Sequence, residues 1–106
     1  MFMLDVTRNE EFMILSYRDA QTERFAAGQR VKQFEPFRRQ AEKVLDRLSA
    51  ATNLRDVAKF PGHRMEKMKG DRKDQWSVKI NAQWRICFVW EEGSPGPSNV
   101  EIVDYH

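Results

Sequence analysis

The residues best suited to acid–base chemistry stand at the end of the chain, as Asp104, Tyr105 and His106. A histidine with an ordinary pKa of about 6.5 donates or accepts a proton near neutrality, and a carboxylate or phenol beside it adds a second proton carrier. The alternatives are a disordered last residue for His106 and an ordinary strand aromatic for Tyr105. The group becomes a candidate site if the fold brings it beside a substrate-binding cation.

Arg85 is the cation in the least expected place. It stands between Trp84 and Ile86, in the run 84–90 whose alternating apolar residues are typical of a central strand. A cation there is costly unless it lines an open ligand face or meets a carboxylate. Two interpretations stay open, a phosphate-binding role or a structural pair with Asp104 or Glu101.

Further basic residues precede the predicted central strands and lie on them. They are Arg64, Lys67, Lys69, Arg72, Lys73 and Lys79. Glu66, among them, is either an exposed carboxylate or a general base. Cutting RNA without a metal requires a base for the ribose 2′-OH, cations for the charge on phosphorus, and a proton donor for the leaving 5′ oxygen. The residues are compatible with that reaction, although any basic sheet offers a similar set.

Composition limits the other classes of function. A chain of 106 residues with a net charge of +2 fits one domain, whose ligand must be argued from local clusters of charge. The single cysteine, Cys87, excludes an internal disulfide and fits a reducing cytoplasm as a packed thiol. We find no membrane-spanning run, no phosphate-binding glycine loop and no paired His or Cys ligands, so we expect no cofactor and no metal.

The elements that must position these residues centre on residues 69–90. The runs 76–80 and 84–90 alternate apolar and polar residues, which predicts two strands of a hairpin. Alternation turns the three tryptophans toward the core, where packing is favoured over stacking on RNA bases. It places Ser77, Lys79 and Arg85 on the opposite face.

The remaining pattern predicts helices before this hairpin and a strand after it. We expect a first strand over residues 12–17, a short helix over 19–27 with Asp19 as N-cap, and a second helix over about 34–48 with Pro36 in its first turn. A single turn over 54–60, a weak strand over 64–69, a turn over 93–99 and a strand over 100–105 follow. This β-α-α-β-β-β order indicates an α+β domain, with two helices packed on one face of a mainly antiparallel sheet.

The segments 62–93 (GHRMEKMKGDRKDQWSVKINAQWRICFVWEEG) and 100–106 (VEIVDYH) resemble the HigB-type toxins of bacterial toxin-antitoxin systems, in the RelE/ParE superfamily. The resemblance covers about residues 13–106. Residues 1–12 lie outside it, and we expect them to form a poorly ordered extension. It implies a RelE-like fold, ribosome-dependent mRNA cleavage without a metal, and neutralisation by a HigA-type antitoxin with a helix-turn-helix domain.

The resemblance also implies activity roles for Lys69, Arg85, Asp104, Tyr105 and His106. Glu66 stands where some members have histidine. We therefore expect Arg85 and Lys69 to hold the scissile phosphate while His106, oriented by Asp104, exchanges protons with help from Tyr105. This hypothesis requires Arg85 and His106 to meet on an open surface.

Two alternatives to an mRNA-cleaving toxin remain open at the level of sequence. The first is a ParE-type toxin that inhibits DNA gyrase without cutting any nucleic acid. The second is a non-catalytic module whose basic face binds RNA or a protein, with an affinity that falls as salt rises.

Overall fold

The computed structural model describes residues 13–105, so the predicted extension over residues 1–12 and the predicted proton carrier His106 lie outside the described residues. Within residues 13–105 no helix has both the length and the apolar character needed to cross a bilayer. The described chain forms one four-stranded antiparallel sheet in the order β1-β2-β3-β4 and three α-helices. The prediction of an α+β domain with a mainly antiparallel sheet is confirmed.

The central hairpin forms where the alternation predicts it. Strand β2 spans Trp76–Lys79 and β3 spans Trp84–Val89. The Asn81 side-chain carbonyl accepts hydrogen bonds from the backbone N–H groups of Gln83 and Trp84, both at 2.8 Å, and this closes the turn. An Asn side chain stabilises a turn in this way because it mimics a backbone acceptor.

The two outer strands join this hairpin from distant parts of the chain. The short edge strand β1, Glu66–Lys67, pairs with β2, and β4, Ser98–Asp104, pairs with β3. Strand β4 begins inside the segment for which we predicted only a turn. Asn99 sustains this because it adopts a positive φ of 51°, which asparagine tolerates better than most residues.

The predicted first strand does not form as a regular strand. Tyr17 makes one parallel bridge to Val100, beside backbone hydrogen bonds from Leu15 to Pro97 and from Arg18 to Val100. The extended stretch is short because the Asp19 carboxylate already caps α2 by accepting from the Thr22 N–H at 2.8 Å. This segment therefore covers the outer edge of β4 without extending the sheet by a full strand.

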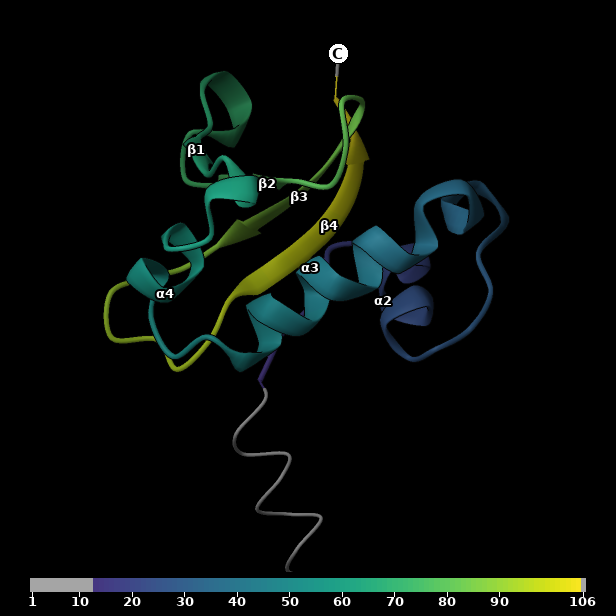
Figure 1. Cartoon of the computed structure of the whole chain (residues 1–106). Helices are drawn as coiled ribbons and strands as arrows, with labels where there is room; N and C mark the ends of the chain where they lie inside the picture. The colour runs from purple at the N-terminus through teal and green to yellow at the C-terminus, as the bar shows by residue number, and fades with distance from the viewer. Residues whose placement is uncertain (1–12, 106) are drawn as a thin grey trace, which may run out of the picture.

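The helices form a layer on one face of the sheet. Helix α2 spans Ala20–Ala26 and α4 spans Leu54–Ala58, with Asn53 as its N-cap. The predicted second helix begins as a 3-10 segment, Lys32–Phe37, that contains Pro36, and becomes α3 only at Arg38–Ala50. Figure 1 shows α3 crossing the sheet beside β4.

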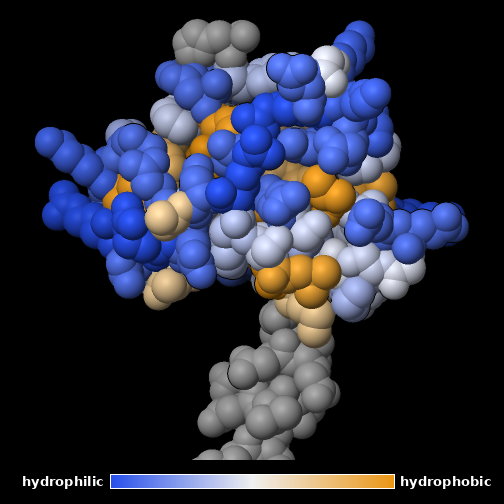
Figure 2. All heavy atoms as spheres, turned by 180° about the vertical axis from the view of Figure 1, so that it is seen from behind, coloured by the Kyte–Doolittle hydropathy of each residue, from blue (hydrophilic) through white to orange (hydrophobic). Residues whose placement is uncertain are grey.

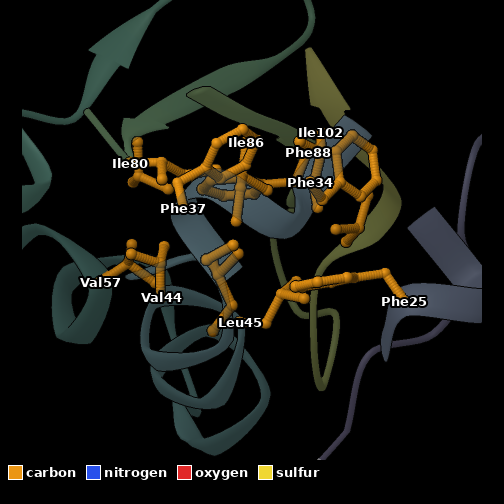
Figure 3. Packing of buried hydrophobic residues seen from close by; sticks show 14 of the residues in the cluster. Phe25, Phe34, Phe37, Val44, Leu45, Val57, Ile80, Ile86, Phe88 and Ile102 are labelled. Carbon is orange, nitrogen blue, oxygen red and sulfur yellow. The ribbon is translucent and has the colours of Figure 1, made fainter. Parts of the chain in front are cut away.

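The core lies between this helical layer and the inner face of the sheet. Figure 3 shows Val44 and Leu45 of α3 packed below Ile86 and Phe88 of the sheet, with Phe25 closing one side. Trp84 joins the core through rings 4.9 Å from Phe37 and 5.8 Å from Phe34, while Trp76 and Trp90 pack against its margin. The tryptophans pack against the core, as predicted, and the opposite face of the sheet remains for polar groups. Seen from behind, the surface is mostly hydrophilic with scattered apolar patches (Figure 2).

Candidate active site

A groove lies between β1 and the residue that follows β4. It has a volume of about 600 Å³ and is lined by residues 66–69 and Tyr105. Tyr105 is held there by its backbone N–H, which donates to the Gln83 carbonyl at 2.6 Å. In Figure 1 strand β1 and the end of β4 lie toward the same end of the molecule. The groove therefore joins two parts of the chain that are almost forty residues apart in the sequence.

Arg85 lies beneath this groove and is buried, with only 7% of its surface exposed. Its Nε donates to the Ser77 hydroxyl at 2.8 Å, and its Nη2 donates to the Arg64 backbone carbonyl at 2.7 Å. Ser77 is itself fully buried. The expectation that Arg85 lies on an open surface is wrong, because the guanidinium finds its hydrogen-bond acceptors inside the sheet.

The alternative role predicted for Arg85 was an ion pair with Asp104 or Glu101. Arg85 does have a carboxylate nearby, but it belongs to another residue. Neither Asp104 nor Glu101 pairs with it; the carboxylate near its Nη2 belongs to Glu66, at 4.0 Å. The Arg85 guanidinium carbon also lies 5.4 Å from the centre of the Tyr105 ring. Arg85 therefore touches both walls of the groove, Glu66 on one side and Tyr105 on the other.

This geometry gives the groove two exposed proton-carrying side chains above a fixed cation. The Glu66 side chain is 55% exposed, and Tyr105 is 42% exposed. Because the Arg85 guanidinium is buried, its field is less screened than that of a surface cation. The arrangement suits an anionic ligand that binds over Arg85 and exchanges protons with the walls.

Two lysines supply exposed positive charge at the same groove. Lys67 Nζ lies 4.8 Å from the centre of the Trp76 ring, which holds the side chain by a cation–π contact. Lys69 is exposed and has no ion-pair partner among residues 13–105. Arg64 is exposed as well, and its left-handed backbone, with φ at 43°, turns its carbonyl toward Arg85. Lys67 and Lys69 therefore form a basic rim on the groove, and Arg64 lies beside it at the Arg85 contact.

The other predicted RNA-binding cations do not line the groove. Arg72 Nη1 donates to Glu101 at 3.0 Å and to Gln75 at 3.0 Å, and the Glu101 hydrogen bond raises the pKa of Arg72. Lys73 is exposed just after the 3-10 turn of residues 70–72. Lys79 pairs in register with Arg85 but lines a different hollow, against α3.

The end of β4 is only partly described. Asp104 lies opposite Trp84 in the β3–β4 register and accepts a hydrogen bond from the Gln83 side-chain amide at 3.1 Å. Since His106 lies outside the described residues, the predicted contact between its imidazole and Arg85 stays a prediction. Asp104 and Tyr105 follow one another, so strand alternation sends their side chains to opposite faces of the sheet.

Two other titratable groups are buried away from the groove. His63 is 1% exposed, and burial lowers the pKa of its imidazole. Its Nδ1 lies 3.0 Å from the Val57 carbonyl, so it has a structural role beside α4. Burial raises the pKa of the Cys87 thiol, which agrees with the predicted packed cysteine.

Sequence reasoning missed how Arg85 is held. Ser77 supplies the buried hydroxyl and Arg64 the carbonyl, and neither was given that role. The alternation that places Ser77 on the same face as Arg85 was the available signal, but strand register was needed to bring them together. Within the described part of the chain, no cluster of His, Cys, Asp and Glu is placed to hold a metal ion.

Comparison with known families decides the class of protein. The model of the RelE-like toxin of the type II toxin-antitoxin system HigB matches residues 15–106. The chain therefore belongs to the HigB-like toxin family. This confirms the resemblance drawn from the sequence, and it means that the protein is a toxin whose partner is an antitoxin.

Two curated relatives of this HigB-like toxin are themselves named HigB. The chain is 31% identical over 67 residues to Endoribonuclease HigB of Proteus vulgaris, an alignment that covers 61% of this chain and 71% of that protein. It is 36% identical over 50 residues to Toxin HigB-1 of Vibrio cholerae serotype O1, which covers 47% of this chain and 50% of that protein. The chain thus spans half the length of the second relative.

Proposed function

We propose that this HigB-like toxin is a metal-independent endoribonuclease that cuts mRNA on the ribosome in the cytoplasm and so inhibits translation. The observation that carries the proposal is the groove in which Glu66 and Tyr105 flank Arg85 below an exposed Lys69. Its relative from Proteus vulgaris is named an endoribonuclease. The relative's name supports the class of reaction, and the groove supplies side chains suited to it.

The proposed reaction needs only proton transfer and charge stabilisation. A base removes the proton of a ribose 2′-OH, and the 2′ oxygen attacks the adjacent phosphorus. The bond from phosphorus to the 5′ oxygen breaks, that oxygen takes up a proton, and a cyclic 2′,3′-phosphate remains. Glu66, exposed in the groove, acts as the base. Tyr105 and His106 supply the returning proton, and Asp104 orients His106.

Charge on the phosphate is stabilised from two directions. Lys69 is exposed at the rim and contacts the phosphate oxygens directly. Arg85 acts from below through its field and by holding Glu66 and Tyr105 apart at the groove walls. Fixed charges of this kind lower the barrier because they need no reorganisation as charge develops. Arg64, Lys67, Lys73 and, more weakly, Arg72 and Lys79 bind the flanking RNA.

The antitoxin partner is proposed to be of the HigA type, with a helix-turn-helix domain. A toxin that cuts mRNA arrests the cell that makes it, so free toxin must be held inactive until the antitoxin is lost. Purification with the antitoxin, followed by its removal, provides the free full-length toxin for the following test.

The test is a purified translation system programmed with one mRNA, in which 5′ ends are mapped after the toxin is added. Wild-type toxin should create new 5′ ends only when ribosomes are present, and Glu66→Gln should lower the cutting rate by about 10²- to 10⁴-fold. Lys32→Ala, an exposed cation outside the groove, serves as the matched control. An intact mRNA with wild-type toxin would refute the proposal, and inhibition of DNA supercoiling by gyrase would then support a ParE-type toxin.

A further inference from the structure

A second feature lies near the C-terminal end of α3, at the exposed residue Phe60. Phe60 follows α4 and is 40% exposed, which is unusual for a large apolar residue in this domain. It borders a hollow of about 270 Å³ between the end of α3 and α4. The hollow is lined by Arg47, Ala50, Ala51, Asp56, Lys59 and Phe60. Two small alanines and one exposed ring give the hollow an apolar interior that a flat ring can enter.

Arg47 gives this hollow a cation without a carboxylate partner. Its guanidinium carbon lies 4.5 Å from the centre of the Phe60 ring, and its Nη1 lies 3.5 Å from His63 Nε2. Within residues 13–105 no carboxylate pairs with it. The pKa of His63 is lowered by burial, so its imidazole does not add a competing charge near neutrality. Arg47 therefore keeps donors and charge for a ligand.

The one acid in the hollow is already satisfied. The Asp56 carboxylate accepts from the Thr52 N–H at 3.1 Å and from the Thr52 hydroxyl at 3.0 Å, and these bonds lower its pKa. Lys59 lies 3.8 Å from it, an exposed and weak pair. With Arg47 and Lys59 against this one carboxylate, the charged residues that line the hollow sum to one positive charge.

Charge on α3 is divided between two sides. Lys43 and Arg47 face a hollow of about 180 Å³ that Lys79 also lines. The acids Glu42 and Asp46 line a different hollow, toward α2. Lys79 is the register partner of Arg85. Lys79 and Arg47 thus line one hollow, and Arg47 also lines the hollow at Phe60.

We infer that the hollow at Phe60 binds one base of a single-stranded RNA, which stacks on the exposed ring while Arg47 and Lys59 contact its phosphates. This inference rests on the proposed RNA-cutting function and adds a second contact to it, away from the scissile bond. Bases stack on aromatic side chains and on Arg planes in most single-strand RNA sites. An amphipathic protein segment fits less well, because two of the three charged residues that line the hollow are cations and Arg47 has no carboxylate partner among residues 13–105, which favours a polyanion.

The two sites are close enough for one RNA segment. Phe60 and Glu66 are six residues apart, and a chain spans at most about 3.6 Å per residue, or about 20 Å here. A strand that ran directly between them at about 3.4 Å per stacked nucleotide would need about six nucleotides. In our proposal one RNA therefore reaches both the groove and the hollow.

The test measures binding of the free, full-length toxin to an uncleavable 2′-O-methyl RNA of about twelve nucleotides, a length typical of single-strand sites. A second series of RNAs has one base at a time replaced by an abasic residue. One abasic position should weaken wild-type binding by about 5- to 100-fold, the range expected for a stacked base. Phe60→Leu keeps the apolar bulk but lacks the ring, so it should bind the intact RNA and that abasic RNA equally.

Leu15→Ala is the matched control, because Leu15 is 45% exposed but lies beside β4 at residue Pro97. It should retain the full abasic effect. An abasic effect of equal size in wild type and Phe60→Leu at every position would overturn the inference, as would a loss of antitoxin binding in Phe60→Leu with unchanged RNA binding. The mRNA-cutting assay separates the two proposals. If the toxin cuts mRNA but Phe60→Leu keeps the abasic effect, the base site alone is wrong. If Phe60→Leu loses the abasic effect but the toxin does not cut mRNA, the proposed reaction alone is wrong.

Discussion

The buried position of Arg85 predicts that this residue holds the fold as well as the groove. Replacing Arg85 by Lys keeps the charge but removes the planar fork that reaches Ser77 and Arg64 at once. A Lys ammonium at the end of a flexible stem reaches one of these acceptors at most. We therefore expect Arg85→Lys to unfold more easily than wild type, although it stays cationic.

The size of the effect follows from the lost hydrogen bond. A hydrogen bond with a charged partner contributes about 1.5–3 kcal/mol, and Arg85→Lys loses one such bond at a site that is 7% exposed. In a domain of this size each kcal/mol shifts Tm by about 4–8 °C. The expected fall is about 6–24 °C for Arg85→Lys. It is larger for Arg85→Ala, which also leaves a cavity and an unpaired Ser77 hydroxyl.

The assay is thermal unfolding followed by circular dichroism, with urea unfolding as a second measurement of the free energy. Lys73→Ala is the control, because Lys73 is exposed and we expect its loss to change stability by no more than about 0.5 kcal/mol. A wild-type Tm in both Arg85 variants would refute the reasoning, since the guanidinium would then be dispensable to the sheet.

Three further predictions concern the groove and the buried histidine. Tyr105→Phe keeps the ring beside Arg85 but loses the hydroxyl, so mRNA cutting should fall by about 10²-fold or more with unchanged Tm; full cutting by this variant would exclude the phenol as a proton donor. Lys69→Ala should weaken RNA binding and reduce the dependence of log affinity on log salt by about one phosphate contact, and an unchanged salt slope would contradict a phosphate role. Burial lowers the pKa of His63 below that of the unfolded chain, so the unfolded state binds the extra proton and stability should fall as pH drops below about 6.5. Urea unfolding at about pH 7 and pH 5 checks this: the fall should be shallower in His63→Asn, and an equal fall in both proteins would contradict the assignment.

The elements that sequence predicted well are those with a strong local signal. The hairpin of β2 and β3 follows from strict alternation, and the N-cap at Asp19 follows from a side chain that binds a free N–H group in the first turn of α2. The start of α3 was predicted too early because Pro36 is compatible with the first turn of an α-helix and equally with the 3-10 segment that precedes it. The first strand was predicted too long, since its apolar run also fits a segment that touches β4 at one bridge.

The candidate site divides in the same way. Glu66, Lys69 and Tyr105 were singled out from the sequence together with Arg85. The structure places the first three in the lining of the groove and Arg85 in contact with Glu66 and Tyr105. Their catalytic roles stay predictions. Arg72 could not be distinguished from a free cation, because its partner Glu101 lies 29 positions away in the sequence. Whether His106 joins the groove stays a prediction.

What the sequence by itself determined is the chemistry available: a basic hairpin with one central arginine, a terminal group of proton carriers, and the motifs that identify a HigB-like toxin. Only the tertiary structure decided how that chemistry is arranged. Strand register brings Ser77 beside Arg85, and the segment before β1 brings the Arg64 carbonyl. The central cation is therefore buried below the groove, and Lys69 supplies exposed positive charge at its rim. The physical reason is that a charge inside a sheet must find hydrogen-bond partners, and those partners come from segments that no local pattern brings together.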